Sequence, residues 1–233
     1  MLLKDNTQRA KQAQTIFYVV IGTLILSVLS SAYQYNLISR IEIGDYNETE
    51  VTLSDTLDTV ITLFGIVVRI ITVVLFLNWL RRAYGNLSRA GLKHVDDERK
   101  AVWAWFIPFM NFVTPYKIVK EIYTETKRLI TPKGERYKLD PSTSILVFWW
   151  ATLIISGVVG NIATRLLNGN TIKDIKSGIL FYGISDIIEI IPAILCILII
   201  KRISADEQTL LRMEEAMLVK KQQDSNNENL VSE

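Results

Sequence analysis

Four long apolar runs, separated by charged segments, constrain this chain more than any other feature. They cover residues 15–38, 57–80, 145–167 and 178–200. An α-helix rises about 1.5 Å per residue, so about 20 apolar residues cross the hydrocarbon core of a bilayer. Backbone groups in lipid must find their hydrogen bonds within the chain, which favours helices. The sequence therefore predicts an all-α polytopic membrane helix bundle with four transmembrane helices spanning residues 15–205.

The composition agrees with a membrane protein of modest loops. Of 233 residues, 49% are hydrophobic and 21% are charged, yet the charged residues gather in blocks between the apolar runs. This length accommodates four spans and excludes a further large soluble domain. The single cysteine, Cys196, lies inside an apolar run, so no intrachain disulfide can form.

A fifth apolar stretch, residues 101–123, differs from the other four. Pro108 and Pro115 each remove a backbone hydrogen-bond donor and disfavour a straight helix. Basic residues flank the apolar part at both ends, with Lys100 before it and Lys117 after it. Positive charge on both sides favours a segment that dips into the membrane and returns, or lies along its interface, over one that crosses.

The distribution of lysine and arginine predicts the orientation. Basic residues are dense in the N-terminal segment 1–14, between the second and third runs, and after the fourth run, whereas residues 39–56 are mainly acidic. Because cytoplasmic loops carry the excess of Lys and Arg, both termini are expected in the cytoplasm, in the cell (cytoplasmic, inner) membrane. A signal peptide cleaved after Ala32 is the alternative for the first run, but the apolar residues continue to Ile38, which favours an uncleaved span.

The C-terminal residues 206–233 are expected in the cytoplasm. Ser204 and Glu207 have the spacing of a capping box, which predicts that a short amphipathic helix begins there. The polar residues at the very end are predicted to be disordered.

Three charged residues lie deep inside the apolar runs, away from their ends: Arg69 in the second, and Asp186 and Glu189 in the fourth. A charge at the bilayer centre costs about 2.5 kcal/mol or more, so it needs a partner or water. Counted from the outer ends of their spans, Arg69 lies ~18 Å deep and Glu189 ~16 Å deep, so the two can pair where the spans touch. Two acids against one arginine leave an excess acid, either protonated or bound to a cation.

Asn161, in the small and polar face of the third run, lies near the level of Asp186. We therefore predict a polar site made by the second, third and fourth spans from Arg69, Asp186, Glu189 and Asn161. Such a site either binds an ion, a proton or a polar solute, or is a buried ion pair that fixes the register of the helices.

A distinctive motif lies on the expected cytoplasmic side, in residues 79–87, 105–111 and 115–123. Its candidate functional residues are Trp79, Arg82, Asn86, Trp105, Pro108, Asn111 and Pro115. One interpretation gives the two asparagines a structural role, as partners for backbone groups that the prolines leave open. The other is that the second half of the motif shapes a plug or a ligand pocket.

This motif resembles the bacterial membrane family named domain of unknown function 4328. That family is similar in having a W-x-x-R-A-x-x-N segment after a span, then a W-F-I-P-x-x-N segment and a proline-led amphipathic helix. The resemblance covers roughly residues 57–205, and Ala104 stands where many relatives have glycine. It implies a multi-pass bacterial membrane protein without an established activity, and it supplies no catalytic residues.

No catalytic motif is recognisable, and the single histidine, His94, lies in a charged loop. We therefore expect no enzyme, no cofactor and no metal. The function expected is a non-catalytic membrane scaffold, sensor or regulatory component; the alternative is an oligomeric small transporter or channel-like protein using the Arg69, Asp186 and Glu189 site. Expected partners are the bilayer, its anionic lipid head groups, and a homo-oligomer or other membrane proteins, with no nucleic acid.

Overall fold

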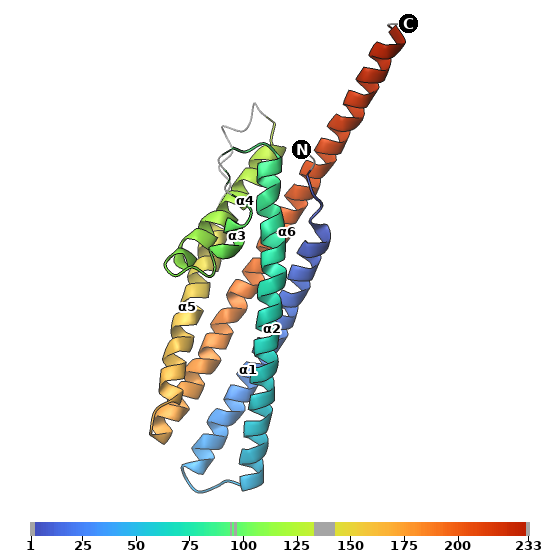
Figure 1. Ribbon diagram of the computed structural model, residues 1–233. Coiled ribbons are helices and arrows are strands. Elements are labelled where there is room, and N and C mark those ends of the chain that lie inside the picture. The colour runs from blue at the N-terminus through green and yellow to red at the C-terminus, as the bar shows by residue number, and fades with distance from the viewer. Residues whose placement is uncertain (1–2, 94, 96, 133–142, 232–233) are drawn as a thin grey trace. The chain divides into compact units, whose positions relative to one another are not determined.

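The computed structural model describes residues 3–93, 95, 97–132 and 143–231, and these are helical with connecting turns and no strand. Four of the described helices are long and apolar enough to cross a membrane: α1 (Thr7–Ile41), α2 (Glu48–Arg89), α5 (Ser144–Leu167) and α6 (Ile172–Val231) (Figure 1). The all-α fold with four long apolar helices is thus confirmed. His94 and the basic residues within 133–142 lie outside the described residues.

Helices α1 and α2 begin where polar side chains satisfy their first N–H groups. Asp5 Oδ1 accepts the backbone N–H of Thr7 at 2.9 Å, and Asn47 Oδ1 accepts that of Thr49 at 2.8 Å. Glu48 and Glu50 in the first turn of α2 complement the positive end of the helix dipole. These caps lie before the apolar runs begin, so α1 and α2 each start several residues ahead of their runs.

One compact unit, called here the membrane unit, comprises Ala13–Leu75 and Ser144–Leu198. Its apolar cluster joins Val20 and Leu24 of α1, Val68 of α2 and Ala193 of α6. Only 17% to 44% of the most apolar window of each of the four long helices is buried within the chain, so large apolar surfaces stay uncovered. Surfaces of this kind are unfavourable in water and suit a lipid environment.

Ion pairs lie at the end of the membrane unit that holds the α1–α2 connection. Arg40 pairs with Glu50, which also accepts the hydroxyl of Tyr33 at 2.8 Å. Lys176 Nζ lies 2.7 Å from Glu42 Oε2. These contacts are partly exposed to solvent and fix the connection between α1 and α2.

The second compact unit, called here the motif unit, comprises Met1–Gln12, Phe76–Thr143 and Ile199–Glu233, described except for the residues excluded above. It contains α3 (Lys100–Trp103), the 3-10 helix η1 (Met110–Phe112) and α4 (Thr114–Ile130). Pro115 lies in the first turn of α4, where a missing N–H does no harm. The buried face of α4 consists of Ile118, Val119, Ile122, Tyr123 and Thr126.

The stretch 101–123 is therefore not one helix. Pieces of four and three residues, α3 and η1, are too short to cross a bilayer, and α4 begins only after them. Pro108 lies in the turn between α3 and η1, as its missing donor requires. Whether this segment dips into the membrane or lies at its interface stays a prediction.

The C-terminal prediction is wrong in two respects. The capping box does not exist, because Ser204 and Glu207 lie inside α6, which continues without a break to Val231. The described part of the tail is helical instead of disordered. Residues 205–224 contain neither proline nor glycine and are rich in Ala, Glu, Leu, Met, Lys and Gln, all good helix formers.

Reporter fusions test the number of crossings. Because α3 and η1 are too short to span, reporters fused after Gly91 and after Thr131 are expected on the same side of the membrane. Alkaline phosphatase and fluorescent-protein fusions at both positions measure this. Opposite sides would mean that residues 101–123 cross the bilayer.

Candidate functional site

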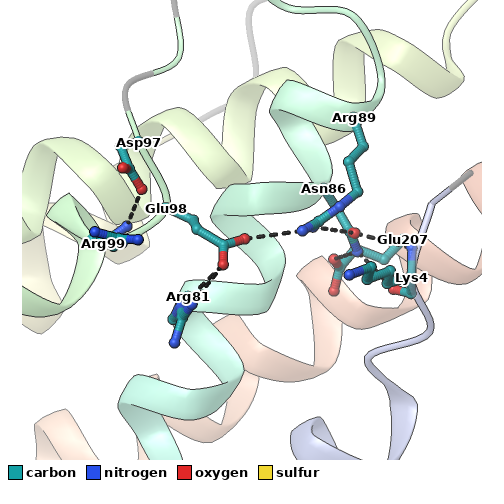
Figure 2. A network of polar contacts seen from close by, with 8 residues as sticks. All are labelled: Lys4, Arg81, Asn86, Arg89, Asp97, Glu98, Arg99 and Glu207. Carbon is teal, nitrogen blue, oxygen red and sulfur yellow. Dashed lines mark hydrogen bonds and ion pairs between the residues drawn. The ribbon is translucent and has the colours of Figure 1, made fainter. Parts of the chain in front are cut away.

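Among the described acids of the motif unit, Glu207 of α6 is the most buried, with an exposed fraction of 5%. Its carboxylate accepts two amide hydrogen bonds, from Asn86 Nδ2 to Oε1 at 3.0 Å and from Asn6 Nδ2 to Oε2 at 3.1 Å. Both oxygens are thereby satisfied by neutral donors, and Figure 2 shows the bond from Asn86. Glu207 thus joins the N-terminal segment, α2 and α6 at one point.

Asn86 also holds the N-terminal segment directly. Its Oδ1 accepts the backbone N–H of Lys4 at 3.1 Å, and its Nδ2 donates to the carbonyl of Lys4 at 2.9 Å (Figure 2). Asn6 Nδ2 donates in addition to the carbonyl of Trp79 at 3.3 Å, and the backbone N–H of Leu3 to Glu214 at 2.8 Å. Leu3, Lys4 and Asn6 are therefore docked by specific bonds.

Burial sets the charge of Glu207. Removal from water raises the pKa of its carboxyl, and the amide bonds from Asn86 and Asn6 oppose this without reversing it. The positive charge of Arg82 also favours the ionised form of Glu207, by electrostatic attraction. Burial is thus the largest influence on the protonation of Glu207.

Glu98 forms the second polar centre. Its Oε1 lies 2.8 Å from Arg81 Nη2 and its Oε2 lies 3.0 Å from Arg89 Nη2 (Figure 2). Burial opposes ionisation of Glu98, but the two guanidinium groups outweigh it and hold the pKa of the carboxyl below its usual value. Gly85 makes room for this contact, since a Cβ there would lie 2.4 Å from Glu98 Oε2.

Arg82, the arginine of the sequence motif, is half-buried within the same unit. Burial and the nearby charges of Arg9 and Arg89 lower its pKa, while Glu98 acts in the opposite sense. Arg9, Arg81, Arg82 and Arg89 therefore lie near one another, with Glu98 as the acid that pairs with two of them. The unit presents a concentration of positive charge.

The motif residues fall into two groups. Trp79 and Asn86 are buried, and Pro115 is buried in the first turn of α4. The interpretation of Asn86 as a partner of backbone opened by the prolines is wrong, because its amide is engaged with Lys4 and Glu207. Its short polar side chain faces the N-terminal segment from α2, far along the chain from either proline.

The remaining motif residues lie in the α3–η1 region. Trp105 is half-buried and contacts Phe76 edge-on, whereas Pro108 is exposed. The Oδ1 of Asn111 is buried and has no hydrogen-bond partner. The predicted plug or ligand pocket at these residues stays a prediction.

In the membrane unit the predicted pair exists. Arg69 Nη2 lies 2.8 Å from Glu189 Oε2, at the common depth that the spacing indicates. The Arg69 side chain is 46% exposed and that of Glu189 is 28% exposed. The pair therefore lies at the surface of this unit and not in its centre.

Asp186 has a different environment. It is buried, and its Oδ2 accepts the hydroxyl of Ser27 from α1 at 2.5 Å. A cavity of about 20 Å³, room for about one water molecule, lies beside it. The cavity is lined by α1, α2 and α6, with Thr62, Arg69 and Tyr182 among its polar residues.

The predicted role of Asn161 is wrong. Its Nδ2 donates to the carbonyl of Gly157 at 2.8 Å in its own helix, and its side chain is exposed. The contact of α5 with α6 is made instead by Ser185, whose hydroxyl donates to the carbonyl of Ser156 at 3.0 Å. Asn161 finds its partner locally, as polar side chains in apolar helices commonly do.

Sequence reasoning missed Glu207, Asn6, Glu98, Gly85 and Ser27. Glu207 offered a signal, as an acid placed four residues after the apolar Ile203, but the spacing to Ser204 favoured a cap. Contacts between residues far apart in the chain, such as Asn6 with Glu207, leave no local pattern. Among the described residues, no group of three or more His, Cys, Asp or Glu could hold a metal ion.

Four long apolar helices and charged ends define a multi-pass membrane protein. The model of one family, described as domain of unknown function (DUF4328), matches residues 44–205, and the chain belongs to this family. No curated protein and no solved structure gave a significant match. The match includes Asn86 and ends two residues before Glu207.

Replacing Asn86 by alanine tests the docking of the N-terminal segment. The change leaves one Glu207 oxygen and both backbone groups of Lys4 without their partner, so we expect a loss of about 2–4 kcal/mol in stability and rapid proteolysis of the N-terminus. Thermal unfolding and limited proteolysis measure both. Asn168→Ala is the control, since Asn168 bonds only within its own helix end. Equal behaviour of the two variants would contradict the assignment.

The raised pKa of Glu207 predicts a pH dependence. The folded protein binds this proton more tightly than the unfolded chain, so the stabilisation is complete below the ordinary value of 4.5 and is lost as pH rises through the raised value. Proteolytic release of the N-terminal segment should therefore become faster with rising pH, and Glu207→Gln should flatten the profile. An unchanged profile in the variant would exclude Glu207 as the titrating group.

Proposed function

We propose that this protein is a non-catalytic membrane scaffold, sensor or regulatory component whose motif unit engages the cytoplasmic leaflet of the bacterial cell membrane. Both termini then lie in the cytoplasm, as the distribution of basic residues favours. The observation that carries the proposal is an apolar segment of the motif unit, residues 103–113, called here the aromatic hairpin.

The aromatic hairpin presents large apolar side chains outward. Trp103, Phe106 and Phe112 are each about 60% exposed, and Phe109 is 89% exposed. Phe109 also has a φ angle of 66°, an unusual conformation for a residue with a side chain. Four neighbouring aromatic side chains exposed to water are unfavourable, so this surface supports contact with an apolar phase.

The position of the aromatic hairpin along α2 supports lipid as the apolar phase that it contacts. The rings of Trp105 and Phe76 meet edge-on, with centroids 5.5 Å apart. Phe76 belongs to the apolar run 57–80, about one turn before Trp79 at its end. The hairpin therefore reaches the level of the last turn of a spanning segment, where aromatic side chains favour the membrane interface.

Charge supports anionic head groups as the lipid partner. Lys100 precedes the aromatic hairpin and Lys117 follows it, and Arg9 and Arg82 add positive charge within the same unit. A basic residue close to an anionic membrane surface contributes about 1 kcal/mol of attraction. Aromatic side chains with basic flanks are thus suited to a leaflet rich in anionic lipid.

Transport by the intramembrane site is the second candidate, and the Arg69–Glu189 pair beside Asp186 favours it. The adjoining cavity of about 20 Å³ holds about one water molecule, too little for a polar solute. This small volume favours the scaffold or sensor. Solute or ion flux in proteoliposomes that stops in Asp186→Asn would favour transport instead.

Fluorescence quenching tests the insertion of the aromatic hairpin. A polarity-sensitive dye on Phe109→Cys should be quenched by nitroxide-labelled acyl chains and protected from aqueous iodide, because its side chain lies in lipid. Met213→Cys, exposed on α6, is the control and should show the opposite pattern. Cys196 is buried, so it should not take up the dye. Quenching of position 109 by iodide would contradict the proposal.

A comparison of nanodiscs tests the preference for anionic lipid. Thermal stability should be higher in phosphatidylglycerol than in phosphatidylcholine, and Arg82→Gln should reduce this difference more than Arg212→Gln on the exposed part of α6. The electrostatic gain should also shrink with added salt. Equal stability in both lipids would remove head groups as partners while leaving insertion of the hairpin untouched.

A further inference from the structure

The Arg69–Glu189 pair is at the surface of the membrane unit at the depth where exposure to lipid is least favourable. Arg69 is at the middle of the apolar run 57–80, and 46% of its side chain is uncovered by the chain itself. Snorkelling relieves basic residues near the ends of spans, and Arg69 is far from either end. The pair therefore requires a further contact within the membrane.

The guanidinium group also keeps unused hydrogen-bonding capacity. It has five N–H donors, and its acceptors in the chain are Glu189 and the hydroxyl of Tyr182. Lipid tails offer no acceptor, and the neighbouring acid Asp186 is buried and bonded by Ser27. The remaining donors of Arg69 can bond a water molecule in the cavity beside Asp186, and those on the uncovered side of the group are open to an acceptor from another protein surface.

The chain itself carries the complementary groups. Arg69 and Glu189 place a positive and a negative charge side by side on one face, so a two-fold axis beside the pair would bring each arginine to the glutamate of the other copy. The four charges then form a neutral, closed arrangement. On the same face of α2, Ile66 and Val73, three and four residues from Arg69, are exposed and supply apolar contacts around it.

We propose that this protein forms a homo-oligomer, with a dimer as its smallest unit, through the face of α2 and α6 that carries Arg69 and Glu189. A second copy covers both charges without a foreign partner having to supply a matching pair. This interface is independent of the aromatic hairpin and of its lipid contacts. It gives the intramembrane charges a role in assembly.

The full-length protein in mild detergent and in liposomes provides the test, by light scattering and by counting subunits through photobleaching. Wild type should be a dimer or a larger homo-oligomer. Arg69→Leu/Glu189→Leu removes both charges together and leaves neither one unpaired, and it should weaken association at least tenfold. The control Arg40→Leu/Glu50→Leu removes an ion pair at the end of the same unit and should leave association unchanged.

Charge reversal distinguishes this interface from a general effect on folding. Arg69→Glu alone and Glu189→Arg alone should each fail to self-associate, because like charges would face one another. Co-expressed with different tags, the two variants should purify together, since one presents two acids and the other two arginines. A monomeric wild type, an unchanged oligomer in the double leucine variant, or no recovery on co-expression would overturn the proposal.

Discussion

The burial of one carboxylate between two asparagine amides determines how the motif unit is held together. Glu207 binds Asn86 and Asn6 and so joins three stretches of chain that are remote in sequence. A buried acid with neutral donors is stable only when each oxygen is satisfied. The docked N-terminal segment provides one of these donors. The order of the N-terminus and the state of Glu207 are therefore linked.

The two units differ in how their charged side chains are paired. In the motif unit Glu98 is shared by Arg81 and Arg89, and positive charge is left in excess. In the membrane unit Arg69 is committed to Glu189, and the second acid, Asp186, has the neutral Ser27 as its hydrogen-bond partner. An excess of positive charge suits a surface near lipid phosphates, whereas unsatisfied charge within hydrocarbon requires protein contacts.

Features set by local composition could be predicted from the sequence. The four long helices follow from apolar length, and the pairing of Arg69 with Glu189 follows from equal depth. The contacts of Asn86 and Glu207 could not be predicted, because they depend on which remote segment docks beside them. The prediction for Asn161 failed for a related reason. Its side-chain amide bonds a carbonyl in its own helix, which costs less conformational entropy than ordering a distant partner.

A double-mutant cycle on Asn86→Ala and Glu207→Ala tests the central claim most directly. The free energy of unfolding of wild type, both single variants and the double variant gives the coupling between the two side chains. A direct bond in a buried site predicts a coupling of about 1–3 kcal/mol, with the double variant little worse than either single one. Additive effects would contradict the account and separate Glu207 from the docking of the N-terminus.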